Sequence, residues 1–149
     1  MVRRELVRTL ALFHVVESEP GLQTALEDSD PDIRIAACKA MGTRPGKVAK
    51  DALLKVIRSD EDGDVQSAGL RALGGFEGQD VYDELKKALA NRDPAIQYAG
   101  IQGLRRLTGQ DWGEDPETWV AGLEGEAPEI VHDGSESFID ALHPRNLFR

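Results

Sequence analysis

The sequence predicts an all-α protein, a short right-handed α-solenoid of stacked antiparallel helix pairs. Four segments in register begin at Val2, Ile33, Val65 and Ile96, so the repeat is 31 or 32 residues long. Each segment has a leucine or methionine eight residues after its start, and apolar residues recur at helical spacing. A repeat of this length is typical of arrays in which each unit is one helix pair.

The four segments are expected to be the second helices of their units. Asp30, Asp62 and Asp93 precede three of them and are predicted N-caps, because a carboxylate accepts a free N–H of the first turn. Proline follows two of these aspartates, which suits the first helical position. Gly42 and Gly74 are expected to stop their helices in the left-handed conformation. Small residues within the helices are expected to let neighbouring helices approach closely.

The first helices of the units are expected in the intervening segments, at residues 22–27, 46–58 and 81–91. In the second of these segments the apolar residues share one face, which we expect to pack inward: Val48, Ala52, Leu53, Val56 and Ile57. A final short helix is expected at 115–123, with Trp119 and Val120 facing inward and Trp112 nearby to close the stack.

One repeat domain, residues 1–124, is therefore expected before a tail at 125–149. The domain would contain a half unit at 2–17, units at about 19–42, 46–74 and 79–109, and the capping helix at 115–123. The half unit lacks its first helix, so it either caps the stack or offers a contact face. The tail is acidic and then hydrophobic, with one helical turn expected at 137–142, and we expect it to dock against the stack.

Composition narrows the functional classes. The 149 residues are 40% hydrophobic with a net charge of −9, which disfavours indiscriminate binding to nucleic acid or anionic lipid. Neither a membrane span nor a signal peptide is recognisable. The single cysteine, Cys38, cannot form an internal disulfide, which fits a reducing, cytoplasmic compartment.

The sequence offers no recognisable catalytic, metal or cofactor site. His14, His132 and His143 lie in different segments without ligand spacing, so no metal is expected. Cys38 lies on a packing helix and is expected to be an inert thiol. The glycine-rich run 74–78 follows a helix instead of a strand, so it is interpreted as a connector and not as a phosphate-binding loop. The carboxylates at 60–64 are interpreted as turn and cap residues.

The second helices carry more basic than acidic residues, although the whole chain is acidic. These helices are expected to line the concave side of the stack, which would then be mildly basic. The candidate partner-binding residues there are Arg34, Lys39, Arg71, Gln97, Gln102 and Arg105. Helix dipoles alone explain the same distribution, because they favour acidic residues at helix starts and basic residues at helix ends.

The run from Leu26 to Gly42, LEDSDPDIRIAACKAMG, resembles the HEAT-like repeats of the phycobilisome-lyase type. The resemblance covers residues 2 to about 109 and implies the solenoid fold. The superfamily includes lyases, DNA-repair glycosylases, assembly factors and adaptors, so the resemblance implies no single activity. The arginine typical of the family stands at Arg3 and Arg34 but is replaced by Gln66 and Gln97. The usual Asp-to-Arg ladder is therefore in doubt over the second half of the stack.

The function predicted from these observations is non-enzymatic. We expect an interaction or scaffold module that binds another protein through the concave face of the repeats. The first alternative is binding of nucleic acid or another anionic ligand through the basic stripe. The second is a lyase-like enzyme, which only the family resemblance implies and for which Tyr98 is the one candidate in the groove.

Overall fold

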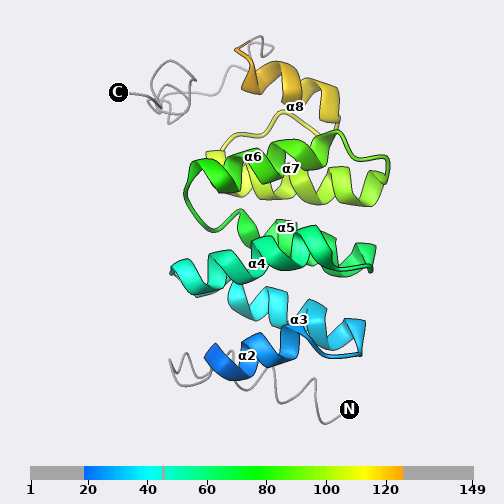
Figure 1. Ribbon diagram of the computed structural model, residues 1–149. Coiled ribbons are helices and arrows are strands. Elements are labelled where there is room, and N and C mark those ends of the chain that lie inside the picture. Colours follow the sequence, from blue (N-terminus) through cyan, green and yellow to red (C-terminus); the bar gives the residue numbers. More distant parts are fainter. Residues whose placement is uncertain (1–18, 45, 126–149) are drawn as a thin grey trace.

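The computed structural model describes residues 19–44 and 46–125, which fold into a stack of helices without a strand. The helices are α2 (Glu19–Leu26), α3 (Pro31–Met41), α4 (Lys47–Ser59), α5 (Gly63–Leu73), α6 (Gln79–Leu89), α7 (Pro94–Thr108) and α8 (Pro116–Leu123). Three antiparallel pairs, α2–α3, α4–α5 and α6–α7, lie one above another, with α8 at the far end (Figure 1). The predicted all-α solenoid is confirmed. The expected half unit at 2–17 and the turn at 137–142 lie outside the described residues.

Aspartate caps begin four of the helices, as expected for three of them from the sequence. The side chains of Asp30, Asp62 and Asp93 accept backbone N–H groups of the first turns of α3, α5 and α7, and Asp115 does the same for α8. Proline opens α3, α7 and α8. Each cap satisfies a backbone donor that the helix itself leaves without a partner, which fixes where the helix begins.

The glycines that end α3 and α5 serve close packing, so the predicted left-handed stop is wrong for them. Gly42 and Gly74 have φ of −63° and −60°, which residues of any type adopt. A Cβ on Gly42 would lie 2.8 Å from the Cβ of Ala72, and one on Gly74 would overlap the backbone of Gly103. Gly109, at the end of α7, does take the left-handed conformation, with φ of 71°.

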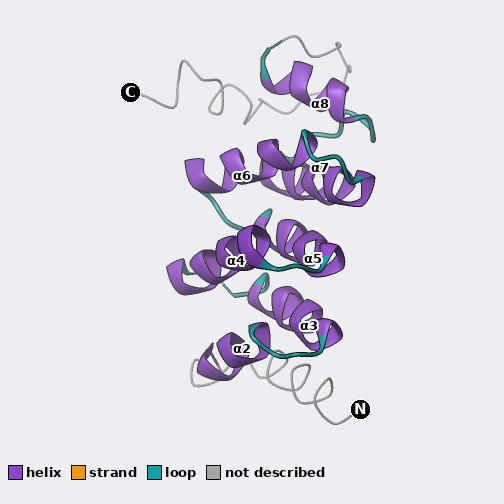
Figure 2. Cartoon of the chain, turned by 45° about the vertical axis from the view of Figure 1, so that its right-hand side comes forward, coloured by secondary structure: helices purple, strands orange, loops and turns teal. Residues whose placement is uncertain are grey.

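The stack has two layers that are held together differently (Figure 2). The second helices α3, α5 and α7 pack directly on one another, which the small residues permit. The first helices α2, α4 and α6 make little direct contact with one another. Ion pairs bridge this layer and its junction with α8: Lys55–Glu27 at 3.0 Å, Lys50–Asp80 at 2.7 Å, Arg58–Glu84 at 2.7 Å and Lys86–Glu124 at 3.2 Å.

The apolar core runs between the two layers, and one predicted core position is wrong. Leu53, Val56 and Ile57 of α4 are buried as expected. Val48 is 47% exposed and Ala52 is half-buried. Their side of α4 stays open because α2 and α4 make so little direct contact.

Two tryptophans close the far end of the stack, as predicted. Trp119 on α8 is fully buried, and its ring centroid lies 4.9 Å from that of Trp112. The indole Nε1 of Trp119 donates to the carbonyl of Gly113 at 2.8 Å, which satisfies its one polar group. A Cβ on Gly122 would overlap the Trp112 ring, so this position holds glycine for space.

Candidate functional site

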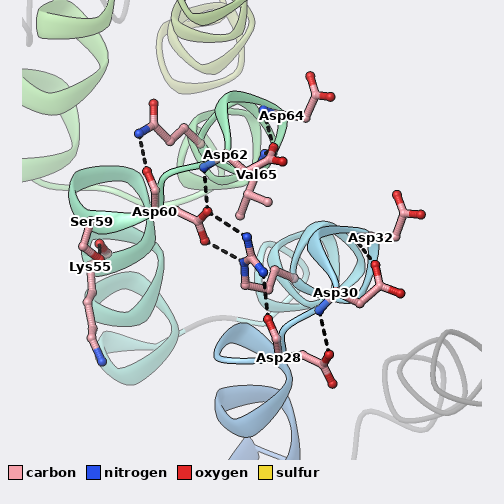
Figure 3. Close-up of polar contacts among 11 residues, drawn as sticks. Asp28, Asp30, Asp32, Lys55, Ser59, Asp60, Asp62, Asp64 and Val65 are labelled. Carbon is pink, nitrogen blue, oxygen red and sulfur yellow. Dashed lines mark hydrogen bonds and ion pairs between the residues drawn. The ribbon is translucent and has the colours of Figure 1, made fainter.

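The turns that precede the second helices share one hydrogen-bonding pattern. In each turn, two side chains spaced two residues apart accept the backbone N–H two positions further along. The first of the two is Asp28, Asp60 or Asn91, and the second is Asp30, Asp62 or Asp93. Figure 3 shows two of these turns, and Asp60 of the second turn lies on the side nearer to the first. The carboxylates at 60–64 thus build turns and caps, as the sequence indicated.

Arg34 joins two adjacent units. Its Nε and Nη2 donate to the two carboxylate oxygens of Asp60 at 2.8 and 3.1 Å, and its Nη1 donates to the carbonyl of Asp28 at 2.7 Å. Burial alone would raise the pKa of Asp60, but the hydrogen bonds from Arg34 and from the Asp62 N–H outweigh it and lower that pKa. The hydrogen bond to Asp60 raises the pKa of Arg34. Arg34, one of the candidate contact residues, therefore holds the two units together.

The matching positions in the next two units keep only half of this arrangement. Gln66 donates to the carbonyl of Asp60 at 2.6 Å, and Gln97 donates to the carbonyl of Asn91 at 2.8 Å. Both bonds repeat the one from Arg34 to the Asp28 carbonyl, six residues back. Where Arg34 meets a carboxylate in the following turn, Gln66 lines the same cavity as Asn91 of the following turn. Arginine and aspartate are thus replaced together by two neutral residues.

Three candidate residues, Lys39, Arg71 and Gln102, occupy one matching position on α3, α5 and α7. This position points away from the first helices, because most of the buried residues of each second helix lie towards the opposite side of the helical wheel, with Ser67 of α5 as an exception. Lys39 and Arg71 are exposed, Gln102 is partly exposed, and Arg71 Nε donates to Gln102 Oε1 across the α5–α7 boundary. We call Lys39, Arg71 and Gln102 the central row.

Two further rows flank the central row. On one side the matching residues are Ile35, Ser67 and Tyr98, of which Tyr98 is 36% exposed, Ile35 is half-buried and Ser67 is buried. On the other side they are Thr43, Gly75 and Arg106, and the guanidinium of Arg106 lies over Gly75 where a Cβ would stand. Arg106 was not among the candidates from the sequence, although it stands in the position that matches Gly75 and Thr43. Arg106 follows Gln102 by four residues, which is one helical turn, so helical spacing from that candidate would have found it.

Arg105 contacts the connection between α7 and α8. Its Nε lies 2.9 Å from Oδ1 of Asp111, and its Nη2 donates to the carbonyl of Gly113 at 2.9 Å. These contacts fasten the connection between α7 and α8. Of the six candidates, the structure therefore brings together Lys39, Arg71 and Gln102 on one surface. Arg34, Gln97 and Arg105 are engaged in contacts that hold the stack and its turns.

Reactive groups of the described residues are placed for packing. Cys38 is fully buried, and burial, assisted by the charge of Asp60, raises the pKa of its thiol to about 12. The thiol is therefore protonated at neutral pH and shielded from solvent. Within residues 19–44 and 46–125, histidine, cysteine and carboxylate side chains form no group of three that is able to hold a metal ion. His14, His132 and His143 lie outside these residues.

Comparison with known families agrees with the geometry. A family model for HEAT repeats matches residues 1–73 and 50–118. The chain belongs to the HEAT repeat family. The match is to HEAT repeats as such, and the phycobilisome-lyase type suggested by the sequence is not confirmed by it. The search of curated proteins found no match.

HEAT repeats generally mediate protein–protein interaction or scaffolding and are generally not enzymes. Arginine at the Arg34 position is typical of HEAT-like repeats, and here it makes the expected link to an aspartate in the following unit. As HEAT second helices, α3, α5 and α7 present the central row at regular intervals. Among the described helices, none has both the length and the apolar character needed to span a membrane.

Proposed function

We propose that this HEAT repeat protein is a non-enzymatic interaction module that binds a protein partner through the exposed side of its second helices. The observation that carries the proposal is the central row together with Tyr98 and Arg106. Tyrosine and arginine are the residue types most often found at the energetic centres of protein interfaces. The second helices pack closely while the first helices stand apart, which favours a stack that curves with this surface on its inner side.

The charge of this surface indicates the kind of partner. Lys39, Arg71 and Arg106 have no ion-pair partner among the described residues, and their positive charges remain available. Asp32 and Asp64 lie near the start of α3 and α5, at the other end of the surface. A partner segment fits this arrangement if it carries acidic residues together with an apolar side chain that contacts Tyr98 and Ile35. A reducing, cytoplasmic setting stays a prediction from the single cysteine.

A charge-reversal experiment tests the proposal. The full chain, tagged, would be used to capture partners from its native cell, and the K39E/R71E variant would be compared with wild type. The control is K47E/R92E, which changes two exposed cations outside the surface by the same total charge. We expect K39E/R71E to lose the specific partner and K47E/R92E to keep it. Equal capture by all three proteins would refute the surface as the binding site.

Nuclease and salt treatment in the same experiment test the nucleic-acid alternative, and the residues around Tyr98 disfavour the lyase alternative. Nucleic acid held by Lys39, Arg71 and Arg106 would be released by nuclease treatment, and its affinity would fall steeply with salt. Lyase-type chemistry would need an acid–base partner beside Tyr98, yet the residues at the matching positions are Ile35 and Ser67. Neither side chain titrates near neutral pH. The protein partner is therefore the function that the surface supports best.

A further inference from the structure

A groove opens on the other side of the molecule, between the first helices α2 and α4. Its volume is about 740 Å³, and it is independent of the surface proposed above. Apolar side chains of Leu26, Val48, Ala52 and Val56 line it, and Val48 is 47% exposed. An exposed valine beside further apolar lining residues is a place where burial by another segment would be favourable.

The next boundary along the stack shows why this groove is open. Gly46 and Gly78, both with φ of 135°, precede α4 and α6 and set these helices in register. In that register Asp80 stands where α4 has Val48, and Glu84 stands where it has Ala52. Asp80 pairs with Lys50 at 2.7 Å and Glu84 pairs with Arg58 at 2.7 Å, so ion pairs bridge α4 and α6. At the α2–α4 boundary the same two positions are apolar and make no ion pair.

The rim of the groove is acidic. Two ion pairs that line it, Lys55–Glu27 and Arg34–Asp60, are neutral overall. Asp51 and Glu61 also line it and have no ion-pair partner among the described residues. The groove therefore combines an apolar floor with uncompensated negative charge. Its complement is a segment that carries large apolar side chains next to cations and has no acidic residue.

Such a segment lies outside the described residues, at positions 143–149. Residues 143–149, HPRNLFR, place Arg145 and Arg149 around Leu147 and Phe148 and include no aspartate or glutamate. We propose that residues 143–149 dock into the α2–α4 groove of the same chain, with Leu147 and Phe148 on the apolar floor and the arginines at Asp51 and Glu61. The acidic stretch 126–140 would be repelled by this rim and acts as the connecting segment.

The connection is long enough. Seventeen residues lie between Gly125 and His143, so eighteen steps of about 3.3 Å each span up to about 60 Å. Helix layers are about 8–10 Å apart, so the groove lies roughly 20–30 Å from α8. A link of this length holds the segment near the groove at a high effective concentration, so weak contacts suffice for docking. Residues 1–18 are a poorer occupant, because they fall within the HEAT repeat match at residues 1–73 and are expected to belong to a repeat.

A paramagnetic label on the full chain tests this contact. N146C provides a site for a nitroxide, and buried, protonated Cys38 stays unlabelled. We expect a strong loss of amide signals for Val48 and Ala52 relative to the reduced label. The loss should disappear in D51K/E61K and persist in E77K/D83K, a matched control in which the second substitution is at the position of α6 equivalent to Asp51.

Three results would overturn the proposal. The first is signal loss centred on Lys39 and Arg71, which would place the segment on the second-helix surface. The second is an unchanged loss at the groove in D51K/E61K. The third is transfer of the loss to an isotope-labelled chain without a nitroxide when the two chains are mixed, which would make a second copy the occupant.

Discussion

The link between Arg34 and Asp60 makes the sharpest prediction about stability, because the next boundary provides its neutral counterpart. The single substitutions R34Q and D60N each remove two charge-assisted hydrogen bonds between side chains that are 17% and 9% exposed. Hydrogen bonds to charged groups contribute about 1.5–3 kcal/mol, so each single variant should lose about that much. For a chain of this size the melting temperature would fall by about 3–10 °C.

The double variant R34Q/D60N should recover most of this loss. It recreates the combination of glutamine and asparagine found at Gln66 and Asn91, and the glutamine at position 34 is still able to donate to the carbonyl of Asp28. We expect the double variant to lie within about 1 kcal/mol of wild type, because both charges disappear together and neither is left partly buried. The two single variants and the double variant form a double-mutant cycle.

Thermal and urea unfolding, followed by far-ultraviolet circular dichroism, would measure the cycle. R58Q is the control, since Arg58 is 55% exposed in its pair with Glu84 and should contribute less than about 1 kcal/mol. If the double variant is as unstable as the sum of the two single variants, Arg34 and Asp60 are not coupled.

Three further predictions concern packing and titration. G74A should cost about 1–3 kcal/mol in unfolding experiments, because its methyl group would overlap the backbone of α7, whereas G75A should be nearly neutral because only the flexible Arg106 side chain has to move. Cys38 should resist a thiol reagent in native protein and react on unfolding, and rapid native labelling would contradict its burial. Because the pKa of Asp60 is lowered on folding, its contribution to stability is complete above about pH 4 and is lost as the pH falls through the folded value. D60N should therefore flatten the acid side of the stability profile, and an unchanged profile would contradict the assignment.

The repeat could be predicted from sequence because its signals are local. Aspartate caps, proline at the first helical position and apolar residues at helical spacing are set by one helix at a time. The role of Gly74 could not be predicted in this way. A glycine at a helix end is consistent with either a left-handed stop or a close contact, and only the position of Gly103 on the next helix decides between them.

Only part of the candidate surface could be predicted, because contacts between units are not visible in the sequence of one helix. Lys39 and Arg34 are both cations on α3, but only the turn of the following unit shows that Arg34 is occupied by Asp60. Val48 fits the inward face of α4 by spacing, and its exposure depends on how far α2 stands away. Contacts between units determine whether Arg34 is paired and whether Val48 is exposed. The residue pattern within one helix does not show these contacts.

The contrast between the two layers has a mechanical consequence. Backbone contact at Gly42 and Gly74 leaves the second-helix layer little room to shorten. Ion pairs between long side chains, such as Lys50–Asp80, tolerate small changes in distance at modest energetic cost. The second-helix layer is therefore the stiffer side of the stack. We expect the stack to bend by changes in the spacing of the first helices. Added salt, which screens those charges, should soften the first-helix layer first.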